Sequence, residues 1–276
     1  KGNPKQSGED VKNRIYDYNY KFNENTYKYL DGKDVGRYFI SWNGLFLKYG
    51  DILAAPRTFD LFSSEKIIIR EITGKYPKSI ISTYSDEIYL FNMSNISINK
   101  KLNKSIDLKY ITVVLNSSLM SYYFINNTAK AVRQMFPKII LQDLRQFPFK
   151  EINLKEQEPF IQKADLMLEL NKKLQELKQN FINELNLEKV PTKLQKFEEL
   201  DFDDFVKEYA KAKKLKFADK LEERNFKNEW QRLFENDKKE VLEIQNQINI
   251  TDKEIDQMVY KLYDLTPDEI KIVEGE

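Results

Sequence analysis

Apolar residues follow two different patterns along the chain, and the pattern changes near residue 150. Before that point, short apolar runs alternate with turn residues, which predicts strands at residues 66–72 and 80–84. A turn at residues 85–87 and a returning strand at 88–93 would complete a β-hairpin. Glycine and proline divide the remainder into short segments, a pattern typical of an irregular, mostly β domain.

One helix is predicted within this first part. Asp107 can cap it, and apolar residues then recur every three or four positions as far as Asn126, which is the repeat of one helical face. Two short extended segments follow at residues 136–141 and 146–149, where proline limits the length of any strand. The apolar positions of the helix are Leu108, Ile111, Leu115, Leu119 and Tyr122.

From Glu156 onward the pattern is that of long helices. Two series of apolar residues recur every three or four positions, which predicts the seam of a short antiparallel coiled coil. Residues 251–254 and 266–269 match the capping-box pattern, so we expect helix to restart twice. The seam residues are Met167, Leu170, Leu174, Leu177 and Phe181, then Val241, Ile244, Ile248, Ile255, Val259 and Leu262; Phe202, Phe205, Tyr209 and Trp230 anchor the segment between them.

These patterns together predict an α+β protein. A length of 276 residues allows one large or two modest domains. We expect a mixed, mostly β domain over residues 1–153, followed by a helical hairpin or coiled-coil tail with inserted helices over residues 154–276.

The composition excludes several kinds of chemistry. The chain has no Cys and no His, so it can form no disulfide, no Cys/His zinc site, no thiol nucleophile and no Ser-His-Asp triad. No apolar run approaches the ~18 residues of a membrane helix. The first residues lack both the apolar core of a secretory signal and an initiating Met, so we expect a cytoplasmic chain that is part of a longer polypeptide.

The net charge of +1 hides two unlike halves. Residues 1–150 carry 23 Lys and Arg against 14 Asp and Glu, whereas residues 151–276 carry 22 against 30. A basic half of this kind favours a polyanionic partner such as nucleic acid. The alternative is an accidental distribution of solvated surface charge.

No catalytic or metal-binding motif is complete in the sequence. The glycines never fall in a GxGxxG or phosphate-loop spacing, and the Asn/Asp-Pro-Pro-Tyr motif of adenine methyltransferases is missing. Pro267-Asp268 followed by Glu269-Ile270-Lys271 resembles a nuclease motif. However, adjacent helical residues point about 100° apart, so the two carboxylates cannot share a metal there, and helix capping explains them better. We therefore predict no catalytic residue and no metal site.

A DNA-binding surface remains the best prediction for the basic half. Lys and Arg hold phosphates, and side chains in turn-rich segments can protrude to read base edges. Trp42 and the Tyr-rich opening can stack on sugars or bases. Lys66 and Arg145 belong to the wider basic set. The predicted DNA-binding residues are Arg37, Trp42, Lys48, Arg57, Arg70, Lys75, Lys78, Lys130, Arg133 and Lys138.

The order of several segments resembles a known family. The segments are GKDVGRYFISWNGLFLKYG, LAAPR, KIIIREITGKYPKSIISTY, DLKYITVVLNSSLMSYYF, FPKIILQDLRQFPF and the tail KEIDQMVYKLYDLTPDEIKIVE. They are similar to the C-terminal target-recognition, or specificity, domain of adenine-specific DNA methyltransferases. The likeness is strongest to the fused single-chain restriction-modification enzymes called type IIG. Leu115-Asn116-Ser117 and the two Phe-Pro pairs, at Phe136 and Phe147, are its most specific part.

This resemblance implies a module that reads a short sequence of double-stranded DNA, packed on helices that space it from a methyltransferase domain of the same polypeptide. S-adenosylmethionine, the catalytic motif and, in the fused enzymes, a Mg²⁺-dependent nuclease would lie upstream, so no cofactor is expected here. Three alternatives remain: a separate specificity subunit of a multi-subunit restriction system, a coiled-coil adaptor that binds protein without DNA, and a hydrolytic enzyme whose carboxylates match no known motif.

Overall fold

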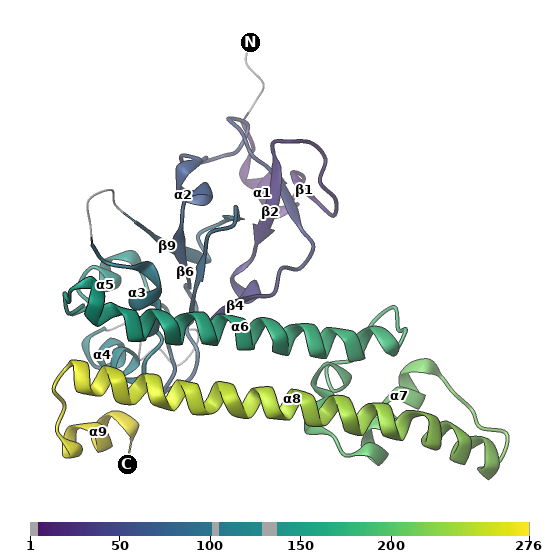
Figure 1. Cartoon of the computed structure of the whole chain (residues 1–276). Coiled ribbons are helices and arrows are strands. Elements are labelled where there is room, and N and C mark those ends of the chain that lie inside the picture. Colours follow the sequence, from purple (N-terminus) through teal and green to yellow (C-terminus); the bar gives the residue numbers. More distant parts are fainter. Residues whose placement is uncertain (1–4, 101–104, 129–136, 276) are drawn as a thin grey trace. The chain divides into compact units, whose positions relative to one another are not determined.

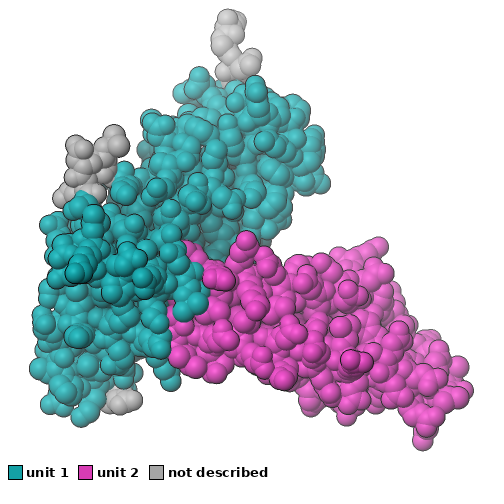
Figure 2. All heavy atoms as spheres, in the orientation of Figure 1, with its two compact units in different colours: residues 1–166, 252–276 teal, residues 167–251 magenta. Residues whose placement is uncertain are grey.

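The computed structural model describes residues 5–100, 105–128 and 137–275. The chain forms two compact units, coloured separately in Figure 2. Unit 1 comprises residues 1–166 and 252–276, and unit 2 comprises residues 167–251. The predicted α+β class is confirmed, since strands gather in the first part of the chain and long helices follow (Figure 1). The predicted domain boundary at residue 153 stays a prediction.

A four-stranded sheet forms the N-terminal part of unit 1. Its order is β1 (Asp17–Tyr18), β5 (Phe46–Lys48), β2 (Thr26–Leu30) and β8 (Leu90–Phe91). β5 runs antiparallel to both β1 and β2, whereas β8 lies parallel to β2. One face of this sheet is covered, because Tyr29 and Leu90 pack with Phe62 in a buried apolar cluster.

A second sheet places β6 (Lys66–Arg70) between β7 (Ser82–Ser85) and β9 (Asn95–Asn99), with all strands antiparallel. The isoleucines at 67–69 are fully buried, which explains why this strand is a continuous apolar run. The predicted strands at 66–72 and 80–84 therefore exist with shifted ends. A short pair, β3 (Val35–Gly36) and β4 (Phe39–Ile40), stands beside this sheet.

The predicted hairpin over residues 80–93 is wrong. β7 pairs with β6, and the returning segment β8 joins the other sheet. The reason is packing: Leu90 is buried against Tyr29 and Phe62, whereas Ile88 is exposed. Turn chemistry at residues 85–87 reverses the chain but does not choose the strand that it meets.

The helix predicted from Asp107 to Asn126 is two helices, α3 (Leu108–Leu115) and α4 (Ser118–Asn127). The predicted Asp107 cap is confirmed, because its side chain accepts a hydrogen bond from the Lys109 amide. Asn116 ends α3 and Ser117 caps α4. The buried Asn116 amide also bonds the Ser82 backbone of β7 on both sides, at 3.1 and 2.9 Å, so the break ties the helices to the sheet.

The short elements of unit 1 differ from the two predicted extended segments. Residue 138 makes an isolated bridge with residue 72, but helix α5 (Leu141–Leu144) begins where the first segment was expected to end. Residues 146–149 form no strand, and residue 136 lies outside the described residues. The other short helices are α1 (Gly8–Lys12), the 3-10 turn η1 (Gly32–Asp34) and α2 (Asp60–Ser63).

Long helices α6 (Leu154–Glu184) and α8 (Lys220–Leu262) carry the two predicted apolar series (Figure 1). All members are buried except Leu177 and Leu262, which are half-buried. The predicted restart at residues 251–254 is wrong, because α8 runs through it without a break. The restart at Thr266 is confirmed: it caps α9 (Pro267–Glu274) in a reciprocal capping box with Glu269.

An aromatic cluster holds unit 2 together. Rings from α6, from the turn η2 (Leu194–Glu199), from α7 (Phe202–Lys213) and from α8 contact one another, with centroids of Phe181 and Phe197 at 3.9 Å. Such pairs add to the apolar area that each ring buries. The predicted anchors Phe202, Phe205, Tyr209 and Trp230 all belong to this cluster.

Candidate nucleic-acid interface

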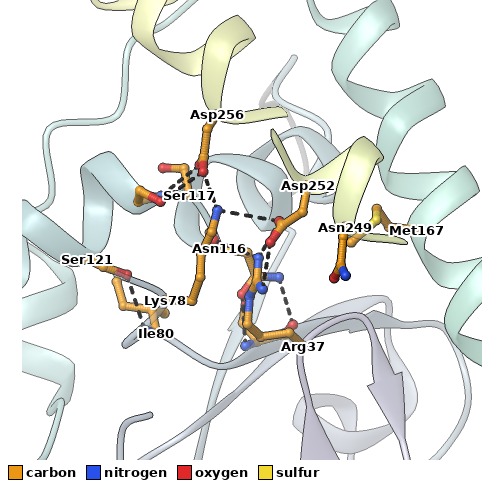
Figure 3. A network of polar contacts seen from close by, with 12 residues as sticks. Arg37, Lys78, Ile80, Asn116, Ser117, Ser121, Met167, Asn249, Asp252 and Asp256 are labelled. Carbon is orange, nitrogen blue, oxygen red and sulfur yellow. Dashed lines mark hydrogen bonds and ion pairs between the residues drawn. The ribbon is translucent and has the colours of Figure 1, made fainter. Parts of the chain in front are cut away.

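Two of the predicted DNA-binding cations are engaged in an ion-pair network inside unit 1 (Figure 3). Arg37 donates from both terminal nitrogens to the Asp252 carboxylate, at 2.5 and 3.0 Å. Lys78 Nζ lies 2.6 Å from an Asp256 oxygen and 3.4 Å from Asp252. We call these four residues the clasp. It joins the turn between β3 and β4 and the loop between β6 and β7 to the last turns of α8.

Neighbouring backbone groups complete the clasp. Arg37 also donates to the Asn116 carbonyl at 3.0 Å, at the junction between α3 and α4. The Asp256 carboxylate accepts from the Ser118 amide at 2.9 Å and from its hydroxyl at 2.8 Å, at the start of α4. Buried charges need such partners, because burial removes the water that would otherwise solvate them.

The charges of the clasp shift one another's pKa values. Burial alone would lower the pKa of the Arg37 guanidinium, but the hydrogen bonds and charge of Asp252 raise it. Burial would raise the pKa of Asp252, whereas Arg37 and Lys78 bring that pKa below its ordinary value. Burial and the charge of Arg37 lower the pKa of Lys78. Arg37 and Lys78 are thus each paired with a carboxylate of α8, and their predicted contact with DNA stays a prediction.

Asp252 and Asp256 were missed in the sequence. Asp252 was expected within a capping box, although it lies inside α8, and Asp256 follows it by one helical turn. A usable signal was present: the two carboxylates lie four residues apart, beside the apolar positions Ile255 and Val259. Acidic residues next to a buried seam need cationic partners, and the basic half supplies them.

Trp42 and Lys66 also have structural roles. The Trp42 indole N–H donates to the Leu45 carbonyl at 2.6 Å, and its ring packs on a buried apolar cluster. Lys66 is fully buried, and its ammonium donates to the carbonyls of Ser64 and Glu87 at 3.0 and 2.7 Å. Burial lowers the pKa of Lys66 to about 8. Lys66 is thus excluded from the interface.

The Lys138 ammonium is partly accessible to a ligand. Its ammonium lies 3.2 Å from both carboxylate oxygens of Glu71, and its side chain is 37% exposed. Half-exposed pairs of this kind are weak, so a phosphate can compete for the lysine. Lys130 and Arg133 lie outside the described residues.

The remaining candidates are cations without a carboxylate partner among the described residues. Arg57 and Lys75 are exposed, and Arg70 and Lys48 are half-buried at the ends of β6 and β5. Lys75 lies in the turn between β6 and β7, where its carbonyl accepts from the Lys78 amide at 3.0 Å. Arg145 is exposed as well. These side chains can reach a phosphate without breaking an ion pair.

A pocket of about 400 Å³ opens beside Arg57. Its walls include Tyr29 and Phe62, and its polar side carries Arg14 between the carboxylates of Asp17 and Asp31. Burial raises the pKa of Tyr29 to about 12, so its phenol stays neutral and can donate a hydrogen bond at physiological pH. Arg14 is occupied by its two partners, which leaves Arg57 and the exposed Lys12 as cations that this pocket can offer to an anion.

The described residues contain no cluster of three or more acidic side chains suited to a metal ion.

Within the described ranges, every helix is too short or too polar to cross a membrane.

Two family models match the chain. Residues 27–149 match the TaqI-like C-terminal specificity domain, and residues 153–259 match a domain of unknown function (DUF8810). A comparison with curated proteins gave no match. The predicted resemblance to a specificity domain is thereby confirmed for residues 27–149. The match supports a role in DNA target recognition in methyltransferase-type systems. A specificity domain is not itself catalytic.

Proposed function

We propose that this chain, whose residues 27–149 match the TaqI-like C-terminal specificity domain, reads a short sequence in double-stranded DNA for an adenine-N6 methyltransferase of a restriction-modification system. Methyl transfer from S-adenosylmethionine, and Mg²⁺-dependent cleavage where the parent enzyme is a type IIG fusion, belong to parts of the polypeptide outside these residues. We expect the protein in the cytoplasm, where its DNA target lies.

The family match is the observation that carries this proposal. The exposed cations give it a physical basis, because Arg57, Lys75 and Arg70 have no carboxylate partner among the described residues and each can neutralise a phosphate. Lys138 adds to this set when Glu71 releases it. The clasp supports the proposal indirectly, since Lys78 anchors the loop between β6 and β7 that also carries Lys75. The helices of residues 153–259 would act as a spacer between this module and its methyltransferase.

Selection from a pool of random duplexes tests the proposal most directly. We expect enrichment of one short motif, with binding that weakens steeply between low and physiological salt as neutralised phosphates regain counterions. Salt-dependent binding without any enriched motif would contradict sequence-specific recognition. The absence of duplex binding at low salt would contradict the whole proposal and favour a protein adaptor.

A charge variant locates the interface in the same assay. Arg57→Ala should weaken duplex binding and reduce the slope of log affinity against log salt by about one. Arg224→Ala is a matched control, because Arg224 is an exposed arginine in the helical unit 2. Equal losses in both variants would show that the cations act through net charge alone.

A further inference from the structure

The second face of the four-stranded sheet is buried at Leu30 and half-buried where β1 and β5 meet. In the sheet register Tyr18 lies opposite Phe46, and Phe46 lies opposite Lys28, so the three side chains share one face. Lys48 follows Phe46 by two residues on the same strand and therefore points the same way. The alternate residues Asp17, Leu47 and Tyr29 point to the opposite face, which carries the pocket and the buried cluster.

Aromatic rings are collected on this face. Tyr18 stacks on Phe22, with centroids 5.4 Å apart and ring planes 9° from parallel, and Tyr20 approaches the edge of Tyr18 at 5.9 Å. Lys48 Nζ lies 5.5 Å from the Phe22 centroid. We name Tyr18, Tyr20, Phe22, Phe46 and Lys48 the stacking face.

The rings of the stacking face are open to solvent. Tyr20 is 57% exposed and Phe22 is 48% exposed, and Tyr18 and Phe46 are half-buried. Exposed aromatic groups that lie together commonly mark binding sites, because an exposed apolar patch is unfavourable in water. The Tyr18 and Phe22 rings are parallel and the Tyr20 ring stands edge-on to Tyr18, so the face offers flat ring surfaces in two orientations.

Charge selects the kind of ligand. Lys48 and the exposed Lys21, which lies between Tyr20 and Phe22 in the sequence, have no carboxylate partner among the described residues. Lys28 at the other end is neutralised, since its ammonium lies 2.8 Å from Glu87. Flat rings beside unpaired ammonium groups match the two parts of a nucleotide, its base and its phosphate.

We propose that the stacking face binds unpaired nucleotides of DNA by stacking their bases on Tyr20 and Phe22 and holding their phosphates on Lys48 and Lys21. This goes beyond the proposed duplex recognition, because bases inside a duplex are stacked on each other and present only their edges. The face would hold a nucleotide displaced from the duplex or a neighbouring single strand.

Fluorescence anisotropy of the intact chain with a labelled oligothymidylate of about 12 nucleotides, a length that several stacked bases would occupy, tests the proposal. Replacing both rings, in Tyr20→Ala with Phe22→Ala, should weaken this binding about tenfold or more and leave affinity for duplex DNA unchanged. Lys48→Gln should lower the salt slope for the single strand by ~0.7. Leu154→Ala is the control, since Leu154 is a 58% exposed apolar residue elsewhere in unit 1.

Photo-cross-linking provides a second measurement that does not depend on a variant folding. An oligonucleotide carrying 5-iodouracil should cross-link to the peptide that contains Tyr20 and Phe22. No affinity of the wild-type chain for the single strand, unchanged affinity in the double variant, or cross-links only to other peptides would each overturn the proposal. If the chain binds the single strand but selection finds no duplex motif, the proposed function is contradicted. This inference would still hold.

Discussion

The cations of the recognition module fall into two regions with opposite behaviour. In the clasp, Arg37 and Lys78 have side chains only 21% and 20% exposed, and both pair with carboxylates of α8. In the loops and strand ends, Arg57 and Lys75 are exposed without such partners among the described residues. The comparison teaches that the cations of a basic sequence form two populations. One population makes ion pairs that stabilise the fold, and the other is free to contact DNA phosphates.

The two regions also differ in how they respond to the loss of a charge. An exposed cation keeps its water, so its removal changes the folded state little. A buried cation whose partner is removed keeps its desolvation cost without compensation. Stability measurements without DNA therefore identify the buried cations, because only their loss destabilises the fold. DNA-binding measurements identify the exposed cations, whose loss leaves stability unchanged.

The largest effect should come from breaking the clasp. Asp252→Ala leaves the Arg37 guanidinium without its carboxylate, and we expect a loss of about 3 kcal/mol in the free energy of unfolding. Urea unfolding followed by circular dichroism measures this loss.

A matched control lies two residues further along α8. Glu254 is 51% exposed and pairs with Lys163 at 2.6 Å, so Glu254→Ala should cost below about 1 kcal/mol. Similar losses in the two variants would mean that Arg37 is not dependent on its partner, and the distinction between the two regions would fail.

Acid should remove the same contribution from the wild-type protein. The pKa of Asp252 is lower in the folded state than its ordinary value of 3.8, since Arg37 and Lys78 outweigh its burial. The stabilisation that ionised Asp252 contributes is therefore fully present above the pKa of this carboxyl in the unfolded state. It is lost as pH falls through the pKa of the carboxyl in the folded state. Unfolding free energies of wild type and Asp252→Asn should differ by a constant amount above about pH 5 and converge below about pH 4. A difference independent of pH would contradict this assignment.

Local features of the fold were predictable from the sequence. Seams such as Val241 to Ile248 follow from spacing, and caps such as Asp107 and Thr266 follow from side chains that bond amides two or three residues away. The strand at Lys66–Arg70 follows from its apolar run. Each of these depends on neighbours along the chain, which a sequence displays directly.

Non-local features were not predictable in the same way. The partner of β8 depends on a cluster that β2 and α2 complete, and the Arg37 pair joins residues 215 positions apart. A basic residue looks alike in either setting until its distant partner is known. Sequence reasoning therefore identified a basic module but could not tell its ion-paired cations from its unpaired ones, and the DNA-binding residues stay predictions.

The exposed region should control DNA binding with a smaller effect. Lys75→Ala should weaken duplex binding about threefold at low salt and leave the unfolding free energy unchanged, because the side chain is exposed. Lys239→Ala, a 76% exposed lysine of unit 2, provides the control. A loss of stability in Lys75→Ala, or an equal loss of duplex binding in Lys239→Ala, would contradict the division of the cations into two populations.

The smallest effect should come from Lys138, which stands between the two regions. Glu71→Gln removes the carboxylate that neutralises this half-exposed lysine, so we expect duplex affinity to rise about twofold and the salt slope to become slightly steeper. The unfolding free energy should change by less than about 1 kcal/mol, as for other partly exposed pairs. Lys138→Gln should change affinity in the opposite direction, and fluorescence anisotropy over a salt series measures both. If neither variant changes affinity, Lys138 belongs with the clasp as a residue that builds the module, because a lysine on the DNA-facing side cannot gain or lose a neutralising partner without effect.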